Sequence, residues 1–129
     1  MLSTRPDGVP SLVYVQPETL VREVFAIMQE HGVSQVPVAQ GEMPLSAAEV
    51  MGAVDELHLM QQSYVGDDVM GEPVEKVMGP KLTTIGAGQS VAFAVDALDD
   101  ARALLVLDGG RPLAVLSRSD VLSFLSTQS

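Results

Sequence analysis

Two pairs of polar residues have a spacing that could support chemistry. Ser117 and Asp120 lie three residues apart, as do Asp55 and His58, and each pair follows a short aliphatic run. The first pair fits a helix N-cap with a first-turn carboxylate, but a hydroxyl beside helix amides can also bind a ligand oxygen. The second pair has the spacing of two metal ligands on one helix, yet two ligands alone do not make a metal site. We therefore predict no metal site and leave both interpretations of Ser117 and Asp120 open.

The residue types that are missing from the sequence exclude several kinds of catalytic site. The absence of cysteine rules out disulfides, thiolate zinc sites and a cysteine nucleophile. No motif ties His31 or His58 to a serine, and no glycine-rich phosphate loop of the Walker type is present. We therefore expect no catalytic residue, no required cofactor and no enzymatic activity in this chain by itself.

The overall charge restricts the kind of partner. The 129-residue chain carries 17 acidic and 7 basic residues, which gives a net charge of −10. Nucleic acids and anionic membranes bind clustered lysine and arginine, so neither is expected as a partner. The N-terminal sequence lacks the apolar segment of a signal peptide, and no apolar run approaches the roughly 20 residues of a spanning helix. We expect a globular, cytoplasmic protein.

Alternating strands and helices must position the polar pairs. In the first half, strands are expected at 11–15 and 35–38, with a helix between them that Thr19 caps and Gly32 ends. Helix propensity alone then favours one long helix over 46–64. The second half argues against that long helix.

The second half repeats the first. Its expected elements are, in order, a strand at 82–85, a helix at 91–98, a strand at 104–107, a hairpin turn at 108–110, a strand at 113–116 and a helix from Ser117 to Leu125. By this repeat, residues 52–54 should form a strand and 55–64 a helix. Residues 65–80 are expected to be a linker with a short helical turn at 74–78.

The repeat defines the domain organisation. We predict an N-terminal tail over 1–10, a first domain over 11–68 and a second domain, with its preceding linker, over 69–129. Neither half, at about 60 residues, can form a comfortable core alone. The fold class is therefore predicted to be α/β, with two βαββα repeats packed sheet to sheet about a pseudo-twofold axis.

Short motifs in both halves resemble a known family. They are Gly32-Val33-Ser34-Gln35-Val36-Pro37-Val38 in the first copy, and in the second Val77-Met78-Gly79-Pro80 before the first strand and Leu116-Ser117-Arg118-Ser119-Asp120-Val121-Leu122 after the last. Their order resembles that of the tandem CBS-domain pair, or Bateman module, from about Ser11 to Leu125. Within that family, the runs 32–38, 85–88 and 120–125 look most like the C-terminal regulatory region of a bacterial cystathionine β-synthase.

The resemblance implies an adenosyl ligand, such as S-adenosylmethionine, AMP or ATP, held between the two copies. Asp120 would accept both ribose hydroxyls, Ser117 would donate to a ligand oxygen, and Arg118 could serve an AMP phosphate. Adenine would occupy an apolar slot with Gln35 at its rim. The candidate ligand-binding residues are Ser11, Leu12, Val13, Val33, Gln35, Val115, Ser117, Arg118, Ser119 and Asp120.

The first copy departs from this pattern. Where the second copy has Ser117 and Asp120, the first has Asp55 and His58, and a histidine cannot accept from two hydroxyls as a carboxylate does. We therefore expect one ligand per chain. The net charge of −10 suits a sulfonium better than a polyphosphate, so S-adenosylmethionine is the first choice and AMP or ATP the second.

The expected role is regulation of an attached or associated enzyme, such as a cystathionine β-synthase, whose catalytic domain would be a partner. Binding would favour one arrangement of the two copies. Helices at 20–28 and 91–98 are candidates to form a homodimer. The alternative is a structural dimerisation module with no physiological small-molecule ligand.

Overall fold

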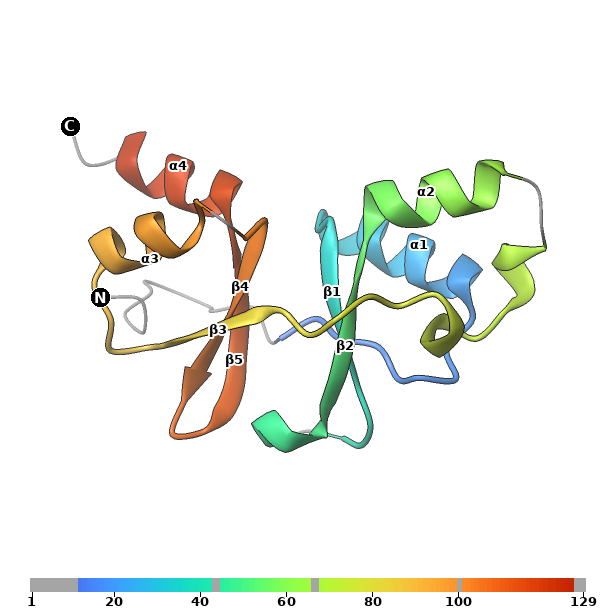
Figure 1. The fold of residues 1–129 in the computed structure, drawn as a ribbon, viewed down its shortest axis with the longest axis horizontal. Coiled ribbons are helices and arrows are strands. Elements are labelled where there is room, and N and C mark those ends of the chain that lie inside the picture. The colour runs from blue at the N-terminus through green and yellow to red at the C-terminus, as the bar shows by residue number, and fades with distance from the viewer. Residues whose placement is uncertain (1–11, 43–44, 66–67, 100, 127–129) are drawn as a thin grey trace. The chain divides into compact units, whose positions relative to one another are not determined.

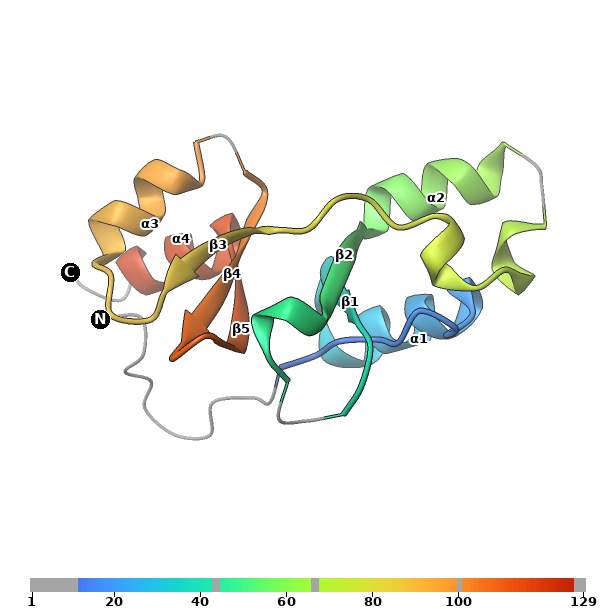
Figure 2. The same ribbon diagram turned by 60° about the horizontal axis from the view of Figure 1, so that its bottom comes forward.

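The computed structural model describes residues 12–42, 45–65, 68–99 and 101–126 (Figures 1 and 2). By their contacts, the residues divide into two compact units, one formed by Val13–Lys81 and the other by Met1–Leu12 with Leu82–Ser129. Each unit combines a small sheet with helices. The predicted α/β class with two repeats is confirmed.

The first unit is built on an antiparallel pair of strands. Helices α1 and α2 lie on the same side of this pair (Figure 1), and their apolar faces form one core with it. Its elements are α1 (Val21–His31), β1 (Gln35–Ala39), the 3-10 turn η1 (Ala47–Glu49), β2 (Val50–Asp55), α2 (Glu56–Tyr64) and the 3-10 turns η2 (Val69–Gly71) and η3 (Val74–Lys76). The predicted strand at 52–54 and helix at 55–64 are confirmed.

The start of α1 differs from the prediction. Leu20, not Thr19, is the N-cap residue, and the Glu23 carboxylate accepts a hydrogen bond from the Leu20 amide at 3.0 Å. Thr19 instead accepts from the amide of Gln16 at 3.2 Å, so its hydroxyl stabilises the turn before the helix. The predicted end is confirmed, because Gly32 adopts a left-handed conformation with φ of 64°.

The strand predicted at 11–15 is wrong over the residues that the structure describes. Only Val15 reaches the sheet, through a parallel bridge to Val38, with hydrogen bonds from Val15 to Pro37 at 3.0 Å and from Ala39 to Val15 at 2.9 Å. The chain then turns through Pro17, which has no amide to continue a ladder. Ser11 lies outside the described residues.

The predicted linker is part of the first unit. Val69 of η2 and Val74 of η3 are buried in the same core as α1 and α2. Further on, Gly79 pairs antiparallel with Ala53 of β2, with N–O distances of 2.8 and 3.3 Å. Residues 69–81, which the sequence-based division assigns to the second domain, therefore pack with the first copy.

Gly52 makes the approach of this segment possible. A Cβ atom on Gly52 would lie 2.5 Å from the carbonyl oxygen of Gly79 and 3.0 Å from the sulfur of Met78. Backbone cannot give way as a flexible side chain can, so a glycine is required at this position of β2.

The second unit has a three-stranded sheet. Its strands follow the order β3-β4-β5, with β3 parallel and β5 antiparallel to β4. Gly109 and Gly110 close the β4–β5 hairpin with φ of 60° and 79°, the sign that a type I′ turn requires. The elements are β3 (Thr83–Gly86), α3 (Val91–Ala97), β4 (Ala103–Asp108), β5 (Arg111–Ser117) and α4 (Arg118–Ser126).

The strands of the two units pair in the same register. In the first, Val15 lies opposite Val38, and in the second Ile85 lies opposite Val106 at the corresponding place. All four side chains are buried. Corresponding positions of the two copies can therefore be compared residue by residue.

Candidate ligand-binding site

The second copy presents its polar pair where β5 passes into α4. The Asp120 carboxylate accepts from the Ser117 amide at 2.9 Å and from the Ser117 hydroxyl at 3.0 Å, both at Oδ2. The Asp120 amide in turn donates to the Ser117 hydroxyl at 3.1 Å. The predicted N-cap is thus confirmed, and the same bonds fix the direction of an exposed carboxylate.

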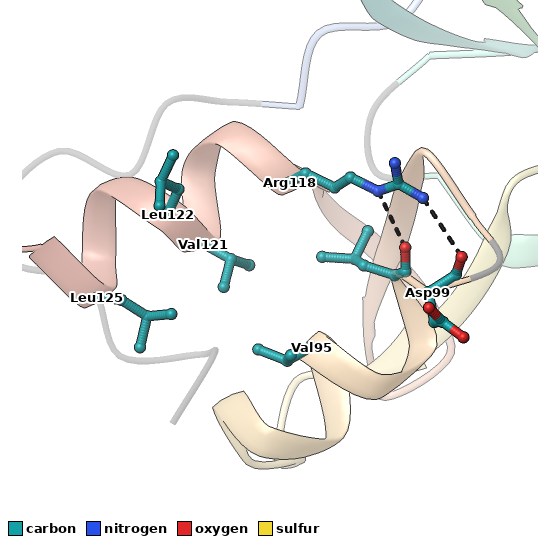
Figure 3. A pocket seen from close by; sticks show the side chains of 7 residues that line it. Val95, Asp99, Arg118, Val121, Leu122 and Leu125 are labelled. Carbon is teal, nitrogen blue, oxygen red and sulfur yellow. Dashed lines mark hydrogen bonds between the residues drawn. The ribbon is translucent and has the colours of Figure 1, made fainter.

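Arg118 turns away from this pair. Its Nε donates to the carbonyl of Leu98 at 3.0 Å and its Nη2 to the carbonyl of Asp99 at 3.4 Å, as Figure 3 shows. These carbonyls are at the C-terminal end of α3, where a cation also complements the helix dipole. Arg118 therefore ties α4 to α3, although the sequence analysis placed it near a ligand phosphate.

The corresponding positions of the first copy bond differently. Asp55 ends β2 opposite Gln35, and Ser117 ends β5 at the same place in the register, so His58 corresponds to Asp120. The side-chain Nε2 of Gln35 donates to Asp55 Oδ1 at 2.9 Å. In α2, His58 Nε2 lies 2.8 Å from the side-chain Nε2 of Gln62. Both polar side chains of this copy are thus engaged with neighbouring glutamines.

The predicted apolar residues are distributed between the units. Val13 and Val33 are half-buried and pack against the core of the first unit. Leu12, which groups with the second unit, is 7% exposed, and Val115 of β5 is half-buried. Ser119 is exposed beside Asp120. Side chains that are only half-buried keep surface that a ligand could cover.

A groove between α3 and α4 was not predicted. It has a volume of about 500 Å³ and its apolar walls come from Val95, Leu98, Val121, Leu122 and Leu125. Arg118 and Asp99 line one end of it (Figure 3). The helical spacing of Val95 and Leu98 was visible in the sequence, but it predicts a buried face and cannot show that a groove lies beside this face among the described residues.

The described residues offer neither a cluster of metal ligands nor a membrane-spanning helix. Nowhere among them do three or more His, Asp or Glu side chains gather closely enough to hold a metal ion. None of the helices described combines the length and the apolar character that crossing a membrane requires.

The sequence matches the family described as CBS domain twice, at residues 9–56 and 74–127. The chain is a tandem CBS-domain protein. The first match ends at the start of α2, the second begins at η3 and runs through the second unit, and together they cover most of the chain. The family part of the predicted resemblance is therefore confirmed.

Solved structures share the fold of this CBS pair. A protein with CBS domains from Burkholderia ambifaria MC40-6 matches with a TM-score of 0.80 and 23% identity, over 99% of this chain and 93% of that one. The CBS domain of the bacterial CNNM/CorC family Mg²⁺ transporter, solved in complex with ATP, matches with 0.72 and 18%, over 92% and 81%. CBSX2, solved in complex with AMP, matches with 0.68 and 21%, over 92% and 90%.

Proposed function

We propose that this CBS pair is a regulatory module that binds an adenosyl ligand through the Ser117–Asp120 pair of its second copy. The observation that carries the proposal is an exposed carboxylate held in a fixed direction at the start of a helix. Two proteins of the same fold were solved with ATP and with AMP, which supports an adenosine-containing ligand.

The Asp120 carboxylate would recognise the ribose. Ser117 holds its Oδ2, so Oδ1 and the outer side of Oδ2 are directed to accept from the two ribose hydroxyls. The amides at the start of α4 would add a partial positive charge for a ligand oxygen. The other candidate contacts stay predictions; they are Ser11, Leu12, Val13, Val33, Gln35, Val115, Arg118 and Ser119.

S-adenosylmethionine is our first choice of ligand, with AMP or ATP second. Arg118, the basic residue next to Ser117 in sequence, donates to the end of α3. The chain carries a net charge of −10, which favours a cationic sulfonium over a polyphosphate. The narrower sequence resemblance to the regulatory region of cystathionine β-synthase supports the same ligand.

Regulation would follow from a shift in population. A ligand that binds one arrangement of the module more tightly raises the share of that arrangement, and an attached or associated catalytic domain can respond to the change. We propose a homodimer as the working unit and an enzyme such as a cystathionine β-synthase as the partner.

Calorimetry with S-adenosylmethionine, AMP and ATP tests the proposal. Asp120→Ala should weaken binding about tenfold or more, since it removes two charge-assisted hydrogen bonds to ribose. Ser117→Ala should weaken binding less, because it only loosens the carboxylate. His58→Ala, the corresponding change in the first copy, should leave affinity unchanged, and the stoichiometry should be one ligand per chain.

Two results would contradict the proposal. Equal affinity of Asp120→Ala and the unmodified chain would mean that the ligand is held elsewhere. If none of the three compounds raises the melting temperature at millimolar concentration, the chain is better described as a structural dimerisation module.

A further inference from the structure

Arg118 and Asp120 lie in the same turn of α4 but bond to different parts of the second unit. The guanidinium of Arg118 donates to the carbonyls of Leu98 and Asp99 at the end of α3 (Figure 3). The Asp120 carboxylate accepts from the amide and hydroxyl of Ser117. β5 ends at Ser117 and α4 begins at the next residue, so no loop separates the two sets of bonds. A single turn therefore connects the exposed carboxylate to α3.

The bonds between Ser117 and Asp120 hold the carboxylate only to the start of its own helix. What holds that helix to the rest of the unit lies on another face. Val121 is buried in the core, and Arg118, three residues earlier, is on the same face of α4 and reaches the end of α3. Asp120 is two residues from Arg118, roughly 200° around the helix. Its position in the unit thus depends on an attachment in which it takes no part.

The first copy has neither the arginine nor the carboxylate. Glu56 and His58 occupy the positions that correspond to Arg118 and Asp120. The start of α2 is attached through the backbone, because the Glu56 amide donates to the carbonyl of Ser34 at 2.9 Å. An ionised glutamate side chain has no donor for a carbonyl. The copy with the exposed carboxylate is therefore the one in which a guanidinium ties the helix start to the preceding helix.

We propose that Arg118 is a positioning residue for ligand recognition, which holds the Asp120 carboxylate in place by attaching the first turn of α4 to the end of α3. This role rests on the proposed function and adds to it a residue that acts without touching the ligand. A group that is already fixed loses less conformational freedom on binding, so the affinity is higher. Loss of Arg118 should therefore weaken the binding of any ligand with a ribose, whether or not it carries a phosphate.

Calorimetry of the full chain with adenosine and with AMP tests this role. Adenosine has the ribose but no phosphate, so it separates positioning from a direct contact with a phosphate. Arg118→Met should raise the dissociation constants of both compounds by the same factor, about threefold to tenfold. Arg118→Lys keeps a cation that can donate to one of the two carbonyls, so it should restore part of the affinity.

Arg22→Met is the matched control. Arg22 of α1 also donates to a backbone carbonyl, that of Met70 at 3.3 Å, and its replacement removes the same charge. Its bond holds η2 in the first unit and has no connection to the start of α4. Adenosine binding should therefore be unchanged in this variant. Thermal unfolding without ligand identifies a temperature at which all variants are folded, and the dissociation constants are compared there.

Combining Arg118→Met with Asp120→Ala shows whether the arginine acts through the carboxylate. In the Asp120→Ala background, Arg118→Met should have no further effect on the dissociation constant of adenosine. An equal effect in both backgrounds, unchanged adenosine binding by Arg118→Met, or a loss confined to AMP would each overturn the positioning role. The proposed function would survive these results, since Asp120→Ala alone would still weaken binding. If neither compound binds the unmodified chain, or if Asp120→Ala has no effect, recognition of ribose by Asp120 fails and the role of Arg118 fails with it.

Discussion

The two copies use corresponding polar positions in different ways. In the second copy, Ser117 and Asp120 bond to each other across the start of a helix, and the carboxylate stays exposed. In the first, Asp55 accepts from Gln35, while His58 is paired with Gln62. The backbone register is the same, so the difference lies in side chains alone. A repeat can thus keep its fold while the polar side chains at corresponding positions have different partners.

A second contrast concerns the middle of β2 in the first copy and of β5 in the second. Gly52 of β2 corresponds to Ala114 of β5, because Val38 and Val106 lie opposite them in the same register. The first copy needs a glycine there because Gly79 approaches β2. The glycine at this position is therefore explained by the segment that packs against β2. The geometry of the strand alone does not require it.

Exchanging these two residues should produce the largest effect. Gly52→Ala gives the first copy the residue of the second, but the added Cβ would displace Gly79 and should cost about 1–3 kcal/mol of unfolding free energy. Ala114→Gly should cost only about 0.5–1 kcal/mol, the usual penalty of glycine in a strand. Urea denaturation measures both. Equal small losses would show that the segment around Gly79 is not held by β2.

Removing the contact between α4 and α3 should have an intermediate effect. Arg118→Met keeps much of the aliphatic length but loses the bonds to the Leu98 and Asp99 carbonyls, and should cost about 1–2 kcal/mol. Glu56→Met, at the corresponding position of the first copy, should change stability by less than about 0.5 kcal/mol. Thermal unfolding of the two variants compares them directly. A larger loss from Glu56→Met would contradict the assigned role of Arg118.

The smallest effect is expected from the polar pair in the absence of any ligand. Asp120→Ala removes an acceptor for the Ser117 amide and hydroxyl and should cost about 1 kcal/mol. His58→Ala removes one exposed contact to Gln62 and should cost less than about 0.5 kcal/mol. Denaturation without ligand gives both values. A loss of several kcal/mol from Asp120→Ala would mean that this residue is structural, and its binding data would need the Ser117→Ala variant as the reference.

Local signals predicted much of this fold. The aliphatic runs gave β1, β4 and β5, Gly32 marked the end of α1, and Ser117 marked the start of α4, because each feature depends on neighbouring residues. The internal repeat corrected helix propensity at residues 52–54. The strand at 11–15 failed because, of the residues described there, only Val15 pairs with the sheet, and apolar character does not show which residues find a partner.

The site was less accessible to sequence reasoning than the fold. Ser117 and Asp120 were found because their spacing is local. The role of Arg118 was missed because its partners, the carbonyls of Leu98 and Asp99, are 20 and 19 residues away and offer no side-chain signal. The groove was missed for a related reason, since it depends on which of the described segments pack beside α3 and α4.

The packing of residues 69–81 determines where this protein can be divided. A polypeptide ending at residue 68 would lose Val69 and Val74 from its core and the backbone partner of Ala53. One that ends at Lys81 keeps all three. Chimeras that combine copies from different members of the family should therefore place the crossover between Lys81 and Leu82, where the contacts themselves divide. A crossover directly after α2 would join a first copy to residues 69–81 of another protein. Those residues would have evolved to pack on a different core.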